Sequence, residues 1–343
     1  MTQTIVSTKH SVAIATFSME KIMRNFIYAA SLAILPFSAQ AASVIDNGII
    51  SLGVDDLGQL NFAGIGLKYL PNNHESTIQG CPCEGWGVGI GETMQSGYAN
   101  NATGIDGLTL QSFTGTSSSA VSIVTVNGTD LRVTHNFAPA TETSNLYRVA
   151  VTIENNGTTD IADLRYTRTF DWDVDPTPFS EYVTIQGTTT TPSVLYADDN
   201  GFSNSNPFAD RTAILFMGDA IDQGPADHGS NFVFGFGALL AGDSYTFDIF
   251  YGAASTEVEI LAALGEVGAE VYSLGQSSGD PLGLGTDGFG NPTTTFAFGF
   301  RGVGGKVIVP DPTPSTVPVP ASGLLLLAGL GAFGVRRKKK ART

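Results

Sequence analysis

The chain has 343 residues, with 32 Asp and Glu against 17 Lys and Arg. Three of the basic residues lie before residue 42 and six lie after Val335, which leaves 8 basic and 31 acidic residues in between and a net charge near −23. Such a body repels nucleic acid and anionic membranes, which excludes nucleic-acid binding, and it favours cations. Solubility is the simplest interpretation of the acidity, and calcium binding is the specific alternative. The 41 Gly and 21 Phe predict short strands and many turns.

The first 41 residues have the pattern of a secretory signal peptide. A basic stretch precedes an apolar run over 26–37, which is too short to span a bilayer and is followed by small residues at Ala39 and Ala41. We expect cleavage after Ala41 and export of the chain that follows. Two internal methionines would each give a conventional leader, and the true start is expected at one of them: Met19 or Met23.

The mature chain is predicted to open with one or two strands over 43–70 and to continue as a long ordered loop over 71–107. Both cysteines, Cys81 and Cys83, lie in that loop. Because the thiols of an exported protein are usually oxidised, we expect a local disulfide between them, in which Pro82 strains the small ring and makes it more reducible. A lipidated or metal-binding role for the two cysteines is the alternative.

Two hairpins are predicted next. The first joins 121–126 to 131–137 through an Asn-Gly pair, which supplies the positive φ of a type I′ turn. The second joins 147–153 to 164–174. On its return strand, apolar residues at even positions alternate with polar residues at odd positions. This alternation predicts one face on a core and one face in water.

The remaining body is predicted to be mostly strand with a single helix. Three later segments alternate aromatic residues with small or polar ones and are predicted as strands: 232–236, 245–251 and 296–300. The helix is predicted to begin at Thr256, whose spacing to Glu259 fits a capping box, and to continue to Val271. The fold expected for 42–308 is therefore one mainly β body, an antiparallel β-sandwich or an enlarged one of two big sheets, with one covering helix.

Acidic residues gather at the end of the second return strand: Asp171, Asp173 and Asp175. Their spacing does not fit an EF-hand loop, which needs Gly at position six and Glu at position twelve. A flat strand holds same-face carboxylates ~6.6 Å apart, so a bend at 176–178 is needed to bring Asp173, Asp175 and Glu181 around one ion. A weaker group of oxygen ligands lies in a predicted turn: Asp198 and Asp199. A solvated strand end and an ordinary turn are the favoured interpretations of these two groups, and bound Ca²⁺ is the specific alternative.

The predicted β body contains no H-E-x-x-H motif and no phosphate-binding loop. Asp173 and Glu181 are a nominal carboxylate pair for glycoside hydrolysis, but the sequence fixes neither their separation nor a raised pKa. His135 lies on an apolar strand face and is expected to be a buried structural histidine. The sequence therefore favours a protein that is not an enzyme.

The chain is predicted to end in a membrane-directed signal. A proline-rich stalk over 309–316 is followed by an apolar run over 321–335, which has 15 residues and is shorter than the ~20 needed to cross a bilayer core. A basic tail over 336–343 is expected to stay in the cytoplasm. Between the stalk and the apolar run stands a short motif: Val317, Pro318, Val319, Pro320 and Ala321.

Segment 317–343 resembles the C-terminal sorting signals of the PEP-CTERM family, in the variant written V-P-L-P-A, with Val319 in the usual Leu position. The resemblance implies recognition by an exosortase-type membrane peptidase of Gram-negative bacteria. It also implies an inner-membrane intermediate and then release or transfer to the cell surface or extracellular matrix. It covers under a tenth of the chain and carries an address only.

For the body itself we expect a structural or adhesive role, with extracellular polysaccharide as a partner. This expectation follows from the two termini, the acidity and the missing catalytic motifs. The alternative is a secreted carbohydrate-binding module or a glycoside-active enzyme.

Overall fold

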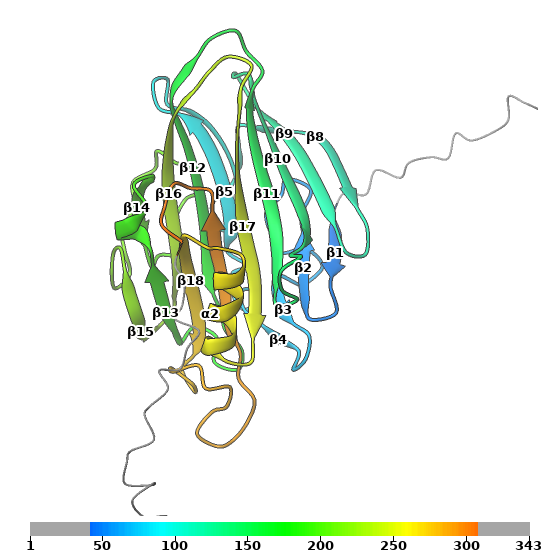
Figure 1. Cartoon of the computed structure of the whole chain (residues 1–343), viewed down its shortest axis with the longest axis vertical. Coiled ribbons are helices and arrows are strands. Elements are labelled where there is room, and N and C mark those ends of the chain that lie inside the picture. The colour runs from blue at the N-terminus through cyan, green and yellow to red at the C-terminus, as the bar shows by residue number, and fades with distance from the viewer. Residues whose placement is uncertain (1–41, 308–343) are drawn as a thin grey trace, which may run out of the picture. The chain divides into compact units, whose positions relative to one another are not determined.

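The computed structural model describes residues 42–307, which form antiparallel sheets packed in sandwich-like layers with one short α-helix (Figure 1). This confirms the predicted mainly β body. The predicted signal cleavage at Ala39 and Ala41 lies outside these residues, as do the stalk, the sorting motif 317–321 and the apolar run 321–335. Within the described range, no helix is long and apolar enough to cross a membrane.

Two large sheets form the layers. In spatial order, the nine-stranded sheet contains β15 (Ala220–Ala226), β13 (Glu181–Gln186), β18 (Val271–Ser277), β19 (Thr295–Arg301), β17 (Ser244–Ala254), β11 (Leu146–Asn155), β10 (Leu131–Pro139), β9 (Ala120–Val126) and β8 (Leu108–Gly115). The six-stranded sheet contains β14 (Val194–Asp198), β16 (His228–Leu239), β12 (Ile161–Trp172), β5 (Glu84–Ile90), β6 (Gln95–Asn100) and β7 (Gly104–Asp106). Strand β12 therefore has a paired neighbour along both of its edges, β16 and β5.

A third, smaller sheet packs against the same core. It contains β1 (Ser43–Asp46), β2 (Ile50–Val54), β3 (Leu67–Tyr69) and β4 (His74–Glu75). Ile45 and Leu52 of this sheet belong to one hydrophobic cluster with Trp86 of β5. The Trp86 indole N–H donates to the carbonyl of Leu57, 2.9 Å away. The opening segment is thus part of the sandwich core and not a separate unit.

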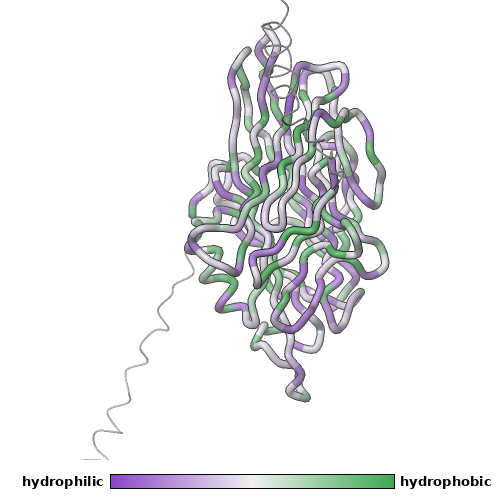
Figure 2. The backbone as a smooth tube through the Cα atoms, turned by 90° about the vertical axis from the view of Figure 1, so that its right-hand side faces the viewer, coloured by the Kyte–Doolittle hydropathy of each residue, from purple (hydrophilic) through white to green (hydrophobic). Residues whose placement is uncertain are grey.

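Aromatic side chains fill the space between the large sheets. Phe170 and Trp172 of β12 lie 5.3 and 5.9 Å, centroid to centroid, from Phe298 of β19. Phe232 of β16 lies 5.3 Å from Phe300 of β19. Figure 2 shows hydrophobic stretches recurring along the strands of the body. The predicted aromatic strands are therefore confirmed, with their rings in the core, where burying each ring contributes ~1.5–3 kcal/mol.

The first predicted hairpin is present and the second is not. Strands β9 and β10 pair as expected, although only Gly128 of the Asn-Gly pair has a positive φ, 75°, so the turn is not type I′. Strand β11 pairs with β10 and β17, whereas β12 pairs with β16 and β5. The two segments lie in different sheets because each directs its apolar face into the shared core, and the chain crosses between the layers after β11.

The predicted loop over 71–107 is instead built of strands β4 to β7. Its glycines misled the prediction because Gly-rich segments usually form turns. In β5 they permit close approach: a Cβ on Gly87 would lie 2.0 Å from the Ser205 carbonyl oxygen, and one on Gly85 would lie 2.5 Å from the Ala99 carbonyl oxygen. The glycines of β5 are therefore needed because neighbouring backbone occupies the space that their side chains would fill.

The helix α2 (Glu257–Glu266) covers the outer face of the nine-stranded sheet, beside β17 and β19 (Figure 1). Thr256 caps its N-terminus, with the Glu259 N–H donating to Thr256 Oγ1 at 3.2 Å, as predicted. The helix ends earlier than expected because Gly268 adopts φ 69° just after it, the left-handed conformation that closes a helix. A 3₁₀ turn, η1 (Thr188–Thr190), follows β13.

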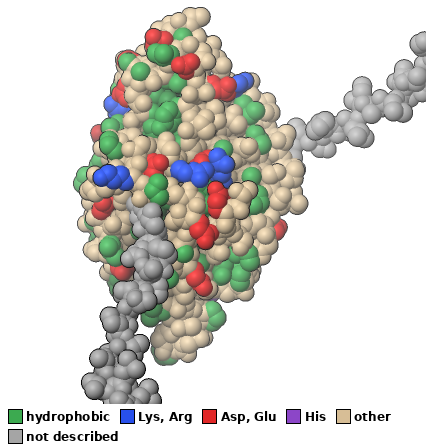
Figure 3. Space-filling model, in the orientation of Figure 1, with side chains coloured by type: hydrophobic (Ala, Val, Ile, Leu, Met, Phe, Trp, Pro, Cys, Tyr) green, Lys and Arg blue, Asp and Glu red, His purple; other side chains and the backbone are tan. Residues whose placement is uncertain are grey.

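Charged side chains are sparse on the face shown in Figure 3, where most of the surface is neither charged nor hydrophobic. Several basic side chains there lie next to acidic ones. Among the described residues, Asp248 forms ion pairs with two arginines. Its Oδ1 lies 2.7 Å from Arg148 Nε, and its Oδ2 lies 2.5 Å from Arg301 Nη2. The acidity of the body is therefore not gathered into one patch on this face.

A candidate cation site at the end of strand β12

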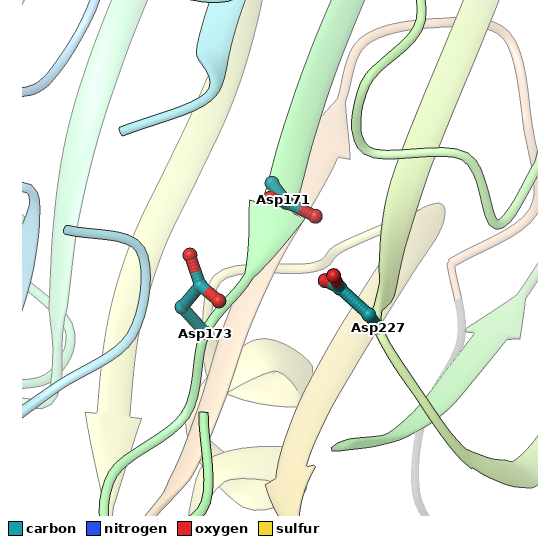
Figure 4. A group of neighbouring side chains, drawn as sticks. All are labelled: Asp171, Asp173 and Asp227. Carbon is teal, nitrogen blue, oxygen red and sulfur yellow. The ribbon is translucent and has the colours of Figure 1, made fainter. Parts of the chain in front are cut away.

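The strand register brings three aspartates together at one end of the six-stranded sheet. Trp172 of β12 lies opposite His228 of β16, and continuing that register by one residue sets Asp173 opposite Asp227. One carboxylate oxygen from each of Asp171, Asp173 and Asp227 lies within 4.8 Å of the other two. Figure 4 shows the carboxylates of Asp173 and Asp227 reaching toward the space between the two chain segments, with Asp171 beside them.

A fourth carboxylate, that of Glu181, lies close enough to influence the group. Glu181 is the first residue of β13, the strand that pairs with β18 in the opposite sheet. Its charge acts on Asp171, and the charges of Asp173 and Asp227 act on it in turn. The His228 ring holds this part of the chain in place, with Nε2 3.1 Å from the Glu181 carbonyl oxygen and Nδ1 2.9 Å from Asp199 Oδ2.

The buried carboxylates have no hydrogen-bond partners. Asp171 is 1% exposed, and Asp173 and Glu181 are 0% exposed. None of their six carboxylate oxygens has a partner among the described residues. An unsatisfied buried acceptor costs about 1–3 kcal/mol, and more when it is charged. The remaining carboxylate of the group, that of Asp227, is exposed. The arrangement therefore has a strong deficit of positive charge.

The deficit appears in the pKa values of the group. Burial, and then the charges of Asp173, Asp227 and Glu181, raise the pKa of Asp171 to about 9. Burial, and then the charges of Asp227 and Glu75, raise the pKa of Asp173 to about 7. Burial raises the pKa of Glu181 to about 8, helped by the charges of Asp173 and Asp227. Without a cation, the group therefore retains protons near neutral pH.

The site is buried because the polar face of β12 is covered, contrary to the expectation that this face lies in water. The segment after Asp199 packs over it: Ser205 Oγ donates to Thr169 Oγ1 at 3.4 Å, and Arg211 donates to Thr167 Oγ1 at 3.2 Å. Thr167 and Thr169 are both 0% exposed. Alternation along β12 thus separates an apolar buried face from a polar buried face, two environments that binary patterning does not distinguish.

Two glycines make room for Asp171. A Cβ on Gly201 would lie 2.6 Å from Asp171 Oδ1, and a Cβ on Gly229 would lie 2.7 Å from the Asp171 Cα. Both distances are under 3.0 Å, closer than a Cβ approaches an unbonded heavy atom. The covering segment and the neighbouring strand can therefore pass this close to the carboxylate only because both positions lack side chains.

The structure brings together only some of the acidic residues singled out in the sequence. Asp171 and Asp173 converge, and Glu181 lies near enough for the charge of Asp173 to act on it, whereas Asp175 Oδ2 accepts the Glu75 N–H at 3.0 Å. The remaining two predicted ligands have partners of their own. Asp198 accepts from the Tyr196 hydroxyl and the Asn200 N–H, and Asp199 accepts from the N–H groups of Ile214, Leu215 and Phe216.

Asp227 was missed by sequence reasoning. Its only local signal is its place in the sequence Asp227-His228-Gly229, an ordinary turn-like context. The β12–β16 register alone reveals its proximity to Asp173, and that pairing is not visible in either segment. The predicted bend at 176–178 does correspond to a turn, in which the Thr177 N–H donates to the Val174 carbonyl at 3.0 Å, and it leads the chain back to Glu181.

The loop before β5 packs beside these ligands. A disulfide joins Cys81 to Cys83, whose Cα atoms are 5.1 Å apart. The Asp171 N–H donates to the Cys83 carbonyl at 2.9 Å, and the Asp173 N–H donates to the Ser76 carbonyl at 2.6 Å. The disulfide loop and the ligand-bearing end of β12 are therefore hydrogen-bonded neighbours.

A second buried ionic group lies further back on β12. Arg168 Nε is 2.5 Å from Glu84 Oε1, and both side chains are 0% exposed. The Leu60 N–H and the Tyr251 hydroxyl also donate to the Glu84 carboxylate, at 2.6 and 3.2 Å. His135, nearby, is fully buried as predicted, and burial lowers its pKa well below the usual value. This group contains its own counter-charge.

The chemistry of the acidic site is that of a hard-cation site. Carboxylate oxygens are the ligands that Ca²⁺ prefers, and nitrogen or sulfur ligands, which zinc prefers, are not among these four residues. The buried cluster could therefore hold a metal ion such as Ca²⁺. No family model and no curated protein matches the chain.

Proposed function

We propose that the protein is exported, is processed by an exosortase-type peptidase, and has a structural or adhesive role at the cell surface or in the extracellular matrix. The observation that carries this proposal is the C-terminal order of motif 317–321, apolar run 321–335 and basic tail. The signal-peptide pattern over 1–41 supports it, since an export address requires an entry signal. The acidic body is suited to a hydrated extracellular polymer layer, where net charge maintains solubility.

We also propose that the body holds Ca²⁺ through Asp171, Asp173, Asp227 and Glu181. The supporting observation is the set of six buried, unpartnered oxygens on three of these residues. A divalent cation would supply the missing positive charge and satisfy those acceptors together. Extracellular calcium sites commonly bind in the 10⁻⁴–10⁻³ M range, which matches a protein working outside the cell.

The proposal assigns no catalytic role to Asp173 and Glu181. Glycoside hydrolysis would require both carboxyl groups to face a sugar ring, whereas both side chains are 0% exposed. A polymeric substrate could not reach them without displacement of the covering chain. The burial of the pair therefore supports a structural role for these residues over the glycosidase alternative.

Sorting is tested by replacing the motif prolines in the native host. Pro318→Ala with Pro320→Ala should leave the protein in the inner membrane, measured by fractionation and immunoblotting. Pro312→Ala with Pro314→Ala, two prolines of the adjacent stalk, is the matched control and should be processed normally. Normal surface delivery of the motif variant, or of the wild type in a host lacking its exosortase, would refute the proposed route.

A further inference from the structure

The disulfide loop and the cation ligands form one hydrogen-bonded unit. Segment 75–83 runs beside 171–175, and each of three backbone N–H groups on the ligand segment is held by a carbonyl of the loop segment. The three donor–acceptor pairs are Asp171 to Cys83 at 2.9 Å, Asp173 to Ser76 at 2.6 Å and Asp175 to Glu75 at 3.0 Å. Displacement of either segment therefore displaces the other.

The disulfide fixes the part of the loop that holds Asp171. The Cys83 N–H donates to the Cys81 carbonyl at 2.6 Å, and Asn61 donates to the Pro82 carbonyl at 2.7 Å. Cys83 is 0% exposed, whereas Cys81 is partly exposed and Pro82 is exposed. A small reductant can therefore approach the bond from the Cys81 side, while the Cys83 carbonyl lies against the ligand strand.

A second contact ties the loop to the turn that leads to Glu181. Gly80, with φ 68°, lies against the Phe179 ring, which a Cβ at that position would approach to 2.6 Å. Phe179 lies two residues before Glu181 in the sequence. Both chain segments that contribute buried ligands, the end of β12 and the start of β13, therefore contact the loop that contains the disulfide.

We propose that cation binding at Asp171, Asp173, Asp227 and Glu181 is coupled to the Cys81–Cys83 disulfide. The bound ion protects the disulfide from reduction, and reduction of the disulfide weakens binding of the ion. The inference rests on the proposed calcium site. Without an ion, nothing bridges the four carboxyl groups, and the ligand segment is held beside the loop by its backbone hydrogen bonds alone. With an ion, the same carboxylates are drawn inward and the loop is held against β12.

The covalent step is an ordinary thiol–disulfide exchange with an external dithiol. One thiolate of the reductant attacks Cys81 Sγ, and the Cys81–Cys83 bond breaks with Cys83 as the leaving thiolate. The second reductant thiolate then attacks the mixed disulfide and releases Cys81. Two electrons pass from the dithiol, which becomes a disulfide, and the two protein thiolates take up two protons. The Cys83 carbonyl then loses the covalent restraint that positions it for Asp171.

Linkage makes the coupling measurable from both directions with the full chain. We expect dithiothreitol to reduce the wild-type disulfide at least about 5-fold more slowly in saturating Ca²⁺ than in EDTA. The reduced fraction is measured over time by alkylation of the free thiols and mass spectrometry. We expect Ca²⁺ affinity, measured by calorimetry, to be at least about 5-fold lower for Cys81→Ser with Cys83→Ser, since coupling between linked sites is typically 5-fold or more. Circular dichroism checks that this variant is folded.

Asp173→Asn is the matched control, since it removes one buried ligand and leaves the disulfide intact. Its reduction rate should not respond to Ca²⁺. If the oxidised and cysteine-free proteins bind Ca²⁺ equally and the wild type is reduced at one rate in both conditions, the coupling is refuted and the calcium site stands. If neither form binds Ca²⁺, the calcium site and the coupling are both refuted.

Discussion

The two buried ionic groups on β12 differ in where their counter-charge comes from. Arg168 has its partner within the chain, Glu84 on the neighbouring strand, and stacks over the Tyr251 ring at 5.4 Å from its centroid. The charges that act on Asp171 and Asp173, a few residues further along, are those of other carboxylates. The first group is thus complete on folding, whereas we propose that the second is completed by a cation from solution. Burial alone therefore does not distinguish a structural charge from a binding site, but the balance of charge does.

The largest effect is expected from breaking the complete group. Arg168→Met leaves the Glu84 carboxylate buried without its cation, and removing one partner of a buried pair typically costs about 3–5 kcal/mol. The loss in unfolding free energy, measured by urea denaturation, should be the same in Ca²⁺ and in EDTA. The double variant Arg168→Met with Glu84→Gln should recover part of it. A loss that appeared only in EDTA would show that the two groups are not independent.

A smaller effect is expected from emptying the second group. Removing Ca²⁺ with EDTA should lower the unfolding free energy by about 2.7 kcal/mol relative to Ca²⁺ at 100 times its Kd, measured as a downward shift in Tm. Asp171→Asn should abolish this response. It should also make the calcium-free protein more stable than the wild type, because an amide can be buried at neutral pH without first taking up a proton. An unchanged Tm of the wild type in EDTA would refute the proposed calcium site.

Asp175→Asn provides the control for that experiment. It changes an aspartate of the same sequence run that lies outside the converging group, and an amide oxygen can still accept the Glu75 N–H. The variant should keep the full calcium response and alter stability by no more than about 0.5 kcal/mol. Loss of the response in this variant would return Asp175 to the ligand set.

A further effect is expected from pH. Folding raises the pKa of Asp173 to about 7, of Glu181 to about 8 and of Asp171 to about 9. The folded state therefore binds protons more tightly than the unfolded state, and this contribution to stability is complete below about pH 4 and is lost as pH rises through 7 to 9. In EDTA, a rise from pH 7 to pH 8 should lower the unfolding free energy by about 1.4 kcal/mol for each proton that the folded state holds and the unfolded state does not.

Calcium should oppose this trend, because the ligands must lose their protons before they bind the ion. Urea denaturation across this pH range, with and without Ca²⁺, separates the two cases. The calcium-dependent increment in stability should grow with pH. Parallel curves in the two conditions would contradict a site formed by these carboxylates.

Local patterns in the sequence predicted most strands and the helix but not their pairing. Alternation located β9 to β12, and the Thr256 cap located the helix start. The assignment of β11 and β12 to different sheets could not be predicted, because a short polar connection between two amphipathic strands fits either a hairpin or a crossing between layers. Strand β5 was not predicted because its glycines resemble those of a loop. They are needed where backbone from elsewhere in the chain, such as that of Ser205, packs directly against the strand.

The candidate site was predictable in part for a related reason. Asp171, Asp173 and Glu181 lie close in sequence, and the turn between them could be anticipated from its prolines. Asp227 and the covering segment come from far along the chain, and only the β12–β16 register brings Asp227 in. The polar face of β12 was predicted to lie in water because threonine and aspartate are mostly exposed in proteins. No pattern in the sequence of β12 indicates that the segment after Asp199 covers it.

Strand β12 is bordered by paired strands on both edges and covered on both faces. Opening it locally would disrupt two ladders and two packed layers, so its backbone has little freedom short of unfolding of the body. The conformational entropy of ordering Asp171 is therefore lost when the chain folds and not when an ion arrives, which is the thermodynamic advantage of a preorganised receptor. Only Glu181 and Asp227, at the start of β13 and just before β16, are left to adjust around an incoming ion.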